Sequence, residues 1–297
     1  MGSLIGGKLA LHGHHVLLVD LWREHIEKIS QHGLTIETDF GKQVARPAAC
    51  LPTNATGVPD LVILLTKTFD SINALQSVYH LVGPTTQLLT LQNGLGSGAA
   101  AATLISKDRV LYGITTLPSD VREPGYVVSH GGGIVRLNSL DPRAQAAAQE
   151  IAQMIRMAGF DCTCDPAIDI VIWEKLAFNA ALNSICAITG LTVGKLGATD
   201  AGVILARQIV GEVCAVARKQ HIGVDEAAIW HNVQESFDKH GKHKPSMLQD
   251  IELGRRTEVE AINGAVVKLG RELDVDIRTT ETLYQLICAR QPPAHKF

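Results

Sequence analysis

The sequence has few aromatic residues and little net charge, and both features argue against a nucleic-acid-binding protein. Phe, Trp and Tyr make up 4% of the 297 residues, the formal net charge is -3, and Lys and Arg form no basic run. Nucleic-acid binding usually needs a basic surface, and single strands also need aromatic side chains on which bases can stack. We therefore do not expect a nucleic-acid partner.

Long apolar runs are also absent. No stretch reaches the ~18 consecutive apolar residues that span a bilayer, and the amino terminus lacks the pattern of a signal peptide. With 46% hydrophobic and 19% charged residues, the composition is that of an ordinary globular protein. We expect a cytoplasmic protein with no membrane partner, and a length sufficient for two domains with separate cores.

Metal ligands do not cluster in the sequence. The six cysteines are scattered, and the closest pair, Cys162 and Cys164, has no second ligand pair for zinc. His12, His14 and His15 lie where a helix is expected to pass into a strand. We therefore expect reduced cysteines and no metal site.

The amino-terminal half alternates helices with apolar strands. HHVLLVD ends at Asp20, DLVILLT ends before Lys67, and TQLLTLQNG stops at Asn93. This alternation predicts the α/β class with a Rossmann-type parallel sheet, in which ligands bind beyond the carboxyl ends of the strands. Asp20, Lys67 and Asn93 are therefore candidate ligand contacts.

The second half is predicted to be all-helical, which divides the chain into a dinucleotide-binding domain (1–160) and a helical substrate domain (161–297). Ser246 and Gln249 have the spacing of a capping box. The final QPPAHKF segment is expected to be mobile. The predicted helices of this half are 167–188, 200–221, 225–238, 246–272 and 279–290.

A polar stripe interrupts the most apolar of these helices. The run WEKLAFNAALN (173–183) places Lys175, Asn179 and Asn183 four residues apart, a spacing that puts them on one face. A helix that is apolar almost all round is usually buried, and burying these groups without partners is costly. The stripe therefore indicates a polar pocket, and the alternative is a solvated face.

The start of the chain is unusual for a dinucleotide-binding fold. Gly2 fits the third glycine of a G-x-G-x-x-G fingerprint, and Asp20 follows at the interval of the ribose-binding acid. The first strand and two glycines of that pattern are missing. We expect Met1 to be an internal methionine of a longer reading frame whose upstream nucleotides encode a strand ending in G-x-G-x. A real truncation is the alternative.

Four segments together resemble the ketopantoate reductases, also called 2-dehydropantoate 2-reductases: LLTKTFD (64–70), LQNGLGS (91–97), WEKLAFNAALNSICAITG (173–190) and SMLQDIELGRRTEVEAINGAVV (246–267). The resemblance covers essentially the whole chain. It implies an amino-terminal Rossmann domain that holds NADPH, and a helical carboxy-terminal domain. The implied reaction is the reduction of 2-dehydropantoate to pantoate, for pantothenate and coenzyme A synthesis.

The resemblance also implies roles for individual residues. Lys175 matches the catalytic lysine that donates a proton to the ketone oxygen. Lys67, Asn93 and Glu258 match positions that contact the cofactor, and Gly2 is the remaining glycine of the phosphate loop. The positions that match substrate-binding residues are Lys175, Asn179, Asn183, Ser246 and Glu258.

Two departures leave alternatives open. Better-studied members carry a further substrate asparagine after the lysine helix, where this chain has LTVGKLG (191–197), so a reductase of another 2-oxo acid or small ketone remains possible. Asp20 would favour NADH through a free 2′-hydroxyl, whereas Arg23 could hold the 2′-phosphate of NADPH, which the resemblance favours. A non-catalytic remnant is a third alternative. A homodimer is compatible with the sequence, which does not itself give an oligomeric state.

Overall fold

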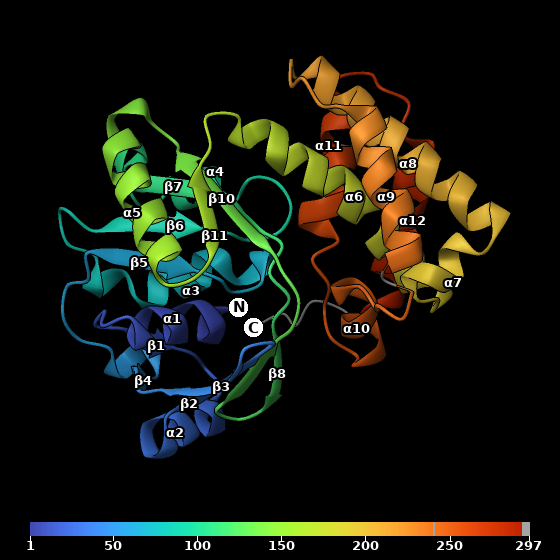
Figure 1. Cartoon of the computed structure of the whole chain (residues 1–297). Helices are drawn as coiled ribbons and strands as arrows, with labels where there is room; N and C mark the ends of the chain where they lie inside the picture. The colour runs from blue at the N-terminus through green and yellow to red at the C-terminus, as the bar shows by residue number, and fades with distance from the viewer. Residues whose placement is uncertain (240, 293–297) are drawn as a thin grey trace. The chain divides into compact units, whose positions relative to one another are not determined.

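The computed structural model describes residues 1–239 and 241–292, so His240 and most of the QPPAHKF segment lie outside the described residues. The chain divides into two compact units (Figure 1). The first comprises residues 1–92 and 96–168, and the second comprises residues 93–95 and 169–297. The domain boundary predicted after residue 160 stays a prediction.

The first unit contains the described strands and five of the described α-helices. Its helices are α1 (Gly2–Leu11), α2 (Arg23–His32), α3 (Ser71–Ser77), α4 (Ser97–Ala101) and α5 (Gln145–Met157). Its strands are β1 (Leu17–Val19), β2 (Leu34–Thr38), β3 (Gly41–Ala45), β4 (Ala48–Cys50), β5 (Leu61–Leu64), β6 (Gln87–Thr90), β7 (Val110–Thr115), β8 (Asp120–Glu123), β9 (Tyr126–Ser129), β10 (Ile134–Ser139) and β11 (Asp161–Cys164).

The predicted α/β class with a Rossmann-type parallel sheet is confirmed, with an antiparallel addition. The order β11-β10-β7-β6-β5 forms one sheet, in which β5, β6 and β7 are parallel and β10 is antiparallel to β7. The chain between β7 and β10 contains the β8–β9 hairpin and no helix, so it supplies no crossover for a parallel return. β1 and β4 pair in parallel apart from this sheet, and β3-β2-β9-β8 form another.

Helices cover both faces of the five-stranded sheet. Leu89 and Leu111 point into a core shared with α1 and α5, whereas their neighbours Leu88 and Val110 point into a core shared with α3 and α4. Successive strand residues face opposite sides, so a strand buried on both faces must be apolar throughout. This is why LVIL (61–64) is a continuous apolar run and why Leu88 and Leu89 of β6 are both apolar.

Two glycines bring α1 close to the strands. A Cβ at Gly6 would stand 2.6 Å from Cδ2 of Leu18 on β1, and one at Gly7 would stand 2.6 Å from Cδ1 of Ile36 on β2. A Cβ at either position would require the leucine or isoleucine side chain to move. The contact fixes the start of α1 near the carboxyl end of β1.

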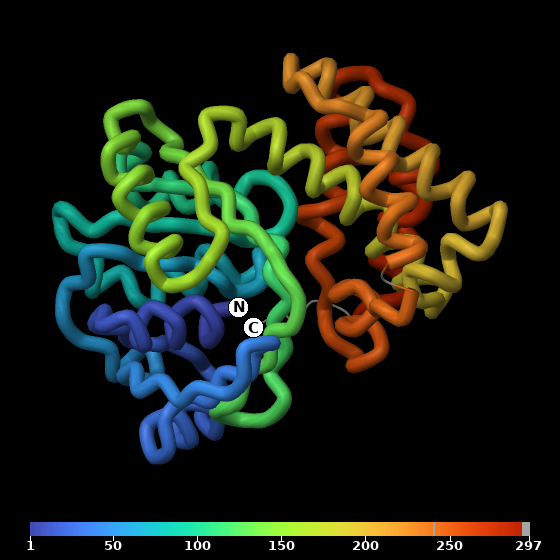
Figure 2. Tube along the Cα trace, viewed as in Figure 1, coloured from blue at the N-terminus to red at the C-terminus, as the bar shows by residue number. Residues whose placement is uncertain are grey.

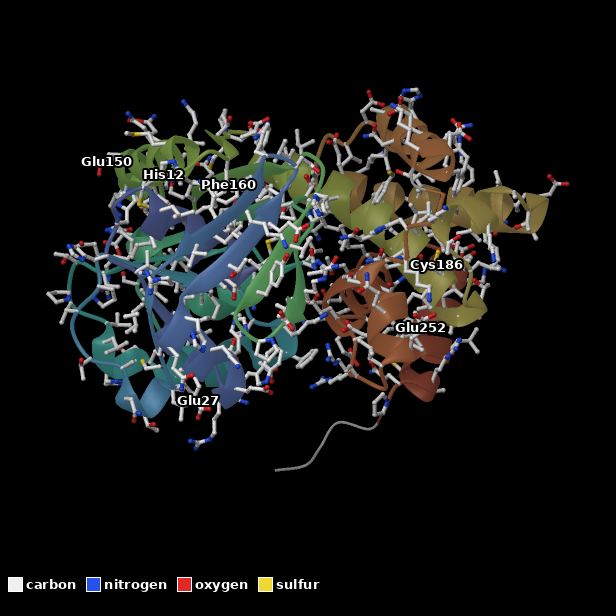
Figure 3. All side chains as sticks on the ribbon, turned by 60° about the horizontal axis from the view of Figure 1, so that its bottom comes forward. His12, Glu27, Glu150, Phe160, Cys186 and Glu252 are labelled. Carbon is white, nitrogen blue, oxygen red and sulfur yellow. The ribbon has the colours of Figure 1, made fainter. Side chains whose placement is uncertain are left out.

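The second unit is helical, as predicted. Figure 3 shows Cys186 of α6 inside this unit, whereas Glu27 and Glu150 point outward from α2 and α5 of the first. The helices are α6 (Ile168–Thr189), whose first residue lies in the first unit, α7 (Val193–Gly197), α8 (Asp200–Lys219), α9 (Glu226–Lys239), α10 (Ser246–Glu252), α11 (Ala265–Glu272) and α12 (Arg278–Arg290), with a π turn at Glu260–Gly264.

Helix α6 lies at the centre of this unit. Leu176, Ala180 and Ile185 are almost completely buried in a core that α8, α9, α11 and α12 also line. Among the described helices, α6 alone has the length and composition to cross a membrane, with a mean hydropathy of 1.2, and 67% of its apolar window is buried inside the structure. That burial is typical of a core helix.

The predicted helix 246–272 is wrong as a single element. Helix α10 ends at Glu252, and Gly254 then adopts a left-handed φ of 63° that stops the helix. Helical structure resumes with the π turn (orange to red in Figure 2). The capping box is also wrong, because Pro245 is the N-cap residue and Gln249 donates to the Lys244 carbonyl at 2.8 Å.

Candidate active site

The polar stripe of α6 lies within the helical unit. Asn183 exposes 6% of its surface, and Lys175 and Asn179 are partly buried. A solvated face is therefore wrong at Asn183. Neither asparagine side chain makes a hydrogen bond to another residue in the described part of the chain. A side-chain amide that makes no hydrogen bond within the protein can bond a polar ligand.

Lys175 has a strongly perturbed ammonium group. Burial lowers its pKa from 10.5 to about 8, and the negative charge of Glu258 opposes this shift. Desolvation disfavours the charged form, while a nearby opposite charge favours it. At neutral pH the group therefore keeps its proton but holds it less tightly than an exposed lysine, which suits a proton donor.

Asn93 joins Lys175 to Glu258. The Lys175 Nζ donates to Oδ1 of Asn93 at 2.8 Å, and Nδ2 of Asn93 donates to Oε2 of Glu258 at 3.1 Å. Residues 93–95 belong to the helical unit, although the sequence places Asn93 at the end of a Rossmann strand. The structure thus brings together three predicted site residues from distant parts of the sequence.

Ser246 is not part of this bonded chain. It is exposed at the first position of α10, and no hydrogen bond of its side chain is present among the described residues. Its substrate role stays a prediction.

The predicted cofactor residues Gly2, Asp20, Arg23 and Lys67 lie in the first unit. Gly2 and Asp20 line one pocket. Burial lowers the pKa of the Met1 amino group, Asp120 and Asp20 oppose that shift, and Lys67 adds to it, which places Asp20 and Lys67 near the start of α1. Arg23 is exposed at the first position of α2.

These residues fit the ribose and phosphate groups of a dinucleotide. Space is open around Gly2, where a Cβ would meet nothing within 4 Å, and α1 begins there with no acidic residue in its first turn. Backbone N–H groups at such a helix terminus bind phosphate. Asp20 accepts the Trp22 backbone N–H through Oδ1 at 3.0 Å, so its carboxylate is fixed beyond β1 with Oδ2 available to a ribose hydroxyl.

A further residue orders the ends of β5 and β6. Gln92 is 5% exposed, and its Nε2 donates to the Thr66 carbonyl at 2.7 Å while its Oε1 accepts from the Ser71 and Thr90 hydroxyls at 3.0 Å each. This network fixes the loop that carries Lys67. The sequence signal was a second polar residue, just before Asn93, at the end of an apolar strand.

Asn263 was also missed. It is fully buried in the π turn, Nδ2 donates to the Ala180 carbonyl of α6 at 3.1 Å, and Oδ1 has no partner among the described residues. No feature of the sequence marked it, because it lay inside the predicted helix 246–272. Among residues 1–239 and 241–292, no group of three or more His, Cys, Asp or Glu residues could hold a metal ion.

Solved structures with this fold include one that contains a nicotinamide cofactor. A ternary structure of D-mandelate dehydrogenase with NADH and anilino(oxo)acetate has a TM-score of 0.93 and 30% identity, covering 98% of this chain and 95% of that one. A 2-dehydropantoate 2-reductase from Geobacter metallireducens GS-15 has a TM-score of 0.90 and 32% identity, over 96% and 94%. The fold and the site define an NAD(P)-dependent oxidoreductase.

Residues 1–142 match the family Ketopantoate reductase PanE/ApbA, and residues 167–291 match Ketopantoate reductase PanE/ApbA C terminal. The chain belongs to the ketopantoate reductase family. A 2-dehydropantoate 2-reductase of Streptococcus pyogenes serotype M18 (strain MGAS8232) is 31% identical over 292 residues, 98% of this chain and 95% of the relative. The resemblance predicted from the motifs is confirmed.

Proposed function

We propose that the protein reduces 2-dehydropantoate to pantoate in the cytoplasm, as a step toward pantothenate and coenzyme A, with Lys175 as the general acid. The observation that carries this proposal is the Lys175 ammonium, which has a pKa of about 8 and hydrogen-bonds to Asn93 beside the carboxylate of Glu258. Curated relatives at 30–31% identity are named 2-dehydropantoate 2-reductase.

The reaction places negative charge on the ketone oxygen, and Lys175 is suited to stabilise that charge. When bound, the reduced nicotinamide supplies a hydride for the ketone carbon of the 2-oxo acid. Negative charge then develops on the ketone oxygen, and the Lys175 ammonium stabilises that charge and transfers its proton to it, which completes the alcohol. Lys175 is left neutral and regains its proton from solvent before the next turnover.

The two asparagines of α6 suit the rest of the substrate. Each amide both donates and accepts, which fits a molecule that carries a carboxylate and a hydroxyl. Asn183 is 6% exposed and has no side-chain hydrogen bond within the described residues, so its amide is available to bond a polar group of a ligand.

For the cofactor we favour NADH over the NADPH that the resemblance implied. Asp20 is fixed beyond β1, where a carboxylate bonds a free ribose hydroxyl and repels a 2′-phosphate. Glu24, in the first turn of α2, adds a second negative charge against the single positive charge of Arg23. The D-mandelate dehydrogenase of high structural similarity is described with NADH.

A second candidate function is the reduction of an aryl 2-oxo acid to its 2-hydroxy acid. Two observations favour it: the 0.93 TM-score to D-mandelate dehydrogenase, and α7, which occupies the stretch where the resemblance expects a further substrate asparagine. Val193 and Leu196 of α7 are buried and apolar.

Steady-state reduction assays distinguish these functions. The purified protein would be assayed with 2-dehydropantoate and with 2-oxo-2-phenylacetate, each with NADH and with NADPH. We expect the highest kcat/KM for 2-dehydropantoate with NADH. A higher kcat/KM for the aryl acid would establish the second function, and no oxidation of either cofactor with any 2-oxo acid would refute both.

A further inference from the structure

The π turn at Glu260–Gly264 is connected to the loop that follows Asn93. Within the turn, the Gly264 N–H bonds to the Val259 carbonyl five residues earlier at 2.8 Å. The Leu95 N–H donates to the carbonyl of Ala261, in the middle of the turn, at 2.9 Å. Single π turns inside helices often occur at functional sites, because one extra residue changes where backbone groups point.

Gly94 lets the loop lie directly against this turn. Its φ of 84° is in the left-handed region, and a Cβ would stand 2.2 Å from the Ala261 oxygen and 2.6 Å from its carbonyl carbon. Both atoms are backbone and cannot swing aside. Gly94 is thus required twice, by the backbone conformation and by the absence of space.

Glu258 lies two residues before the same turn and is bonded to its backbone. The N–H groups of Ala261 and Ile262 both donate to the Glu258 carbonyl at 3.1 Å. The backbone contact at Ala261 therefore fixes the loop before Leu95 relative to the residue whose side chain Asn93 binds. Asn93 and Glu258 are thus both connected to one turn by backbone hydrogen bonds of nearby residues, and Lys175 donates to Asn93 from α6.

We propose that Gly94 and the π turn are positioning elements that hold the Asn93 amide between Lys175 and Glu258. This inference rests on the proposed role of Lys175 as the general acid. Gly94 carries no reacting group, so its effect on catalysis is exerted through Asn93. Displacing Asn93 would remove the oxygen that accepts a hydrogen bond from the Lys175 ammonium, which makes the protonated form less favourable.

The test compares Gly94→Ala with a matched control, Gly96→Ala. Gly96 lies two residues away with a similar φ of 89°, but a Cβ there would meet nothing within 4 Å. Both variants carry the left-handed strain, and only the first collides with Ala261. The measurements are kcat, KM for each reactant, and kcat against pH, all made below the melting temperature of each variant.

We expect Gly94→Ala to lower kcat at least tenfold, since small displacements of reacting groups have large effects on rate. Its kcat should also begin to fall at a lower pH than in the wild type, and Asn93→Ala should add little to it in the double variant. Gly96→Ala should keep the wild-type pH profile. A wild-type kcat and pH profile in Gly94→Ala would overturn the inference, whereas an inactive wild type would instead refute the proposed function.

Hydrogen exchange in the wild-type protein is a second measurement that does not depend on any variant folding. The Leu95 N–H should exchange as slowly as the Gly264 N–H, because both are bonded to the same turn. Fast exchange of Leu95 alone would show that the loop is not held by the turn, and would also overturn the inference.

Discussion

The residues proposed to act on the substrate and those proposed to bind the cofactor differ greatly in burial. On the substrate side, Lys175, Asn93 and Glu258 are linked by hydrogen bonds, and Glu258 is 6% exposed. On the cofactor side, Asp20 and Arg23 are exposed beyond β1 and at the start of α2. Burial lowers the pKa of the Lys175 ammonium, whereas groups that recognise a ribose or a phosphate can lie at the surface.

The largest effect is expected from Lys175→Met on the substrate side. Turnover should fall by about a hundredfold or more, the usual scale for loss of a general acid. Cofactor binding should be retained, as measured by titration with NADH. Lys195→Met is a suitable control, because Lys195 is exposed in the same unit. Unchanged turnover in Lys175→Met would remove the lysine from the mechanism.

The same variant should make the protein more stable near neutral pH. The lowering of the Lys175 pKa from 10.5 to about 8 corresponds to ~3 kcal/mol that the folded state loses by burying the charge. This cost is present in full below pH 8 and disappears as the pH rises to 10.5, so the gain in the free energy of unfolding should shrink over that range. Denaturant unfolding at pH 7 and pH 10.5 would measure it, and equal gains at both would contradict the burial argument.

A smaller and different effect is expected on the cofactor side. Asp20→Ala removes the carboxylate that favours a free 2′-hydroxyl, so the ratio of kcat/KM with NADH to that with NADPH should fall about tenfold, the scale of a lost hydrogen bond to a charged group. The pH profile of kcat should stay unchanged. Asp60→Ala is the control, because Asp60 is exposed before the amino end of β5. A wild-type ratio in Asp20→Ala would place cofactor selection elsewhere.

The smallest effect is expected in the pH dependence of kcat, where substitution of Glu258 is compared with substitution of the exposed Glu252. In the wild type, kcat should fall as the pH rises through about 8, because Lys175 loses its proton. Glu258→Gln removes the charge that favours the protonated lysine, so the fall should begin at lower pH. Glu252→Gln, at an exposed carboxylate on α10 (Figure 3), should leave the profile in place. A shift to higher pH in Glu258→Gln would contradict the assigned electrostatics.

Much of the candidate site could be predicted from the spacing of polar residues on one helix and from the positions where apolar strands end. The four-residue spacing of Lys175, Asn179 and Asn183 placed them on one helix, and the apolar strands ended close to Asp20, Lys67 and Asn93. Both patterns depend on local geometry, in which a repeat of 3.6 or 2 residues shows directly in the order of residues.

Contacts between distant segments could not be predicted in this way. The bonds from Asn93 to Lys175 and Glu258 span 82 and 165 residues of sequence. The π turn was hidden because its residues, EAING, continue a pattern that is typical of an uninterrupted helix. The capping box failed because Pro245, rather than Ser246, occupies the N-cap position, which shifts the spacing by one residue.

The assignment of residues 93–95 to the helical unit has a practical consequence for anyone who divides the gene. A polypeptide that begins at residue 169 would contain Lys175 and Glu258 but not the amide that joins them. If residues 1–168 were added as a separate chain, Asn93 would be present again, but it would belong covalently to that other chain. The helical half is therefore not a self-contained module, and a proton donor built from its fragment alone would differ from that of the intact enzyme.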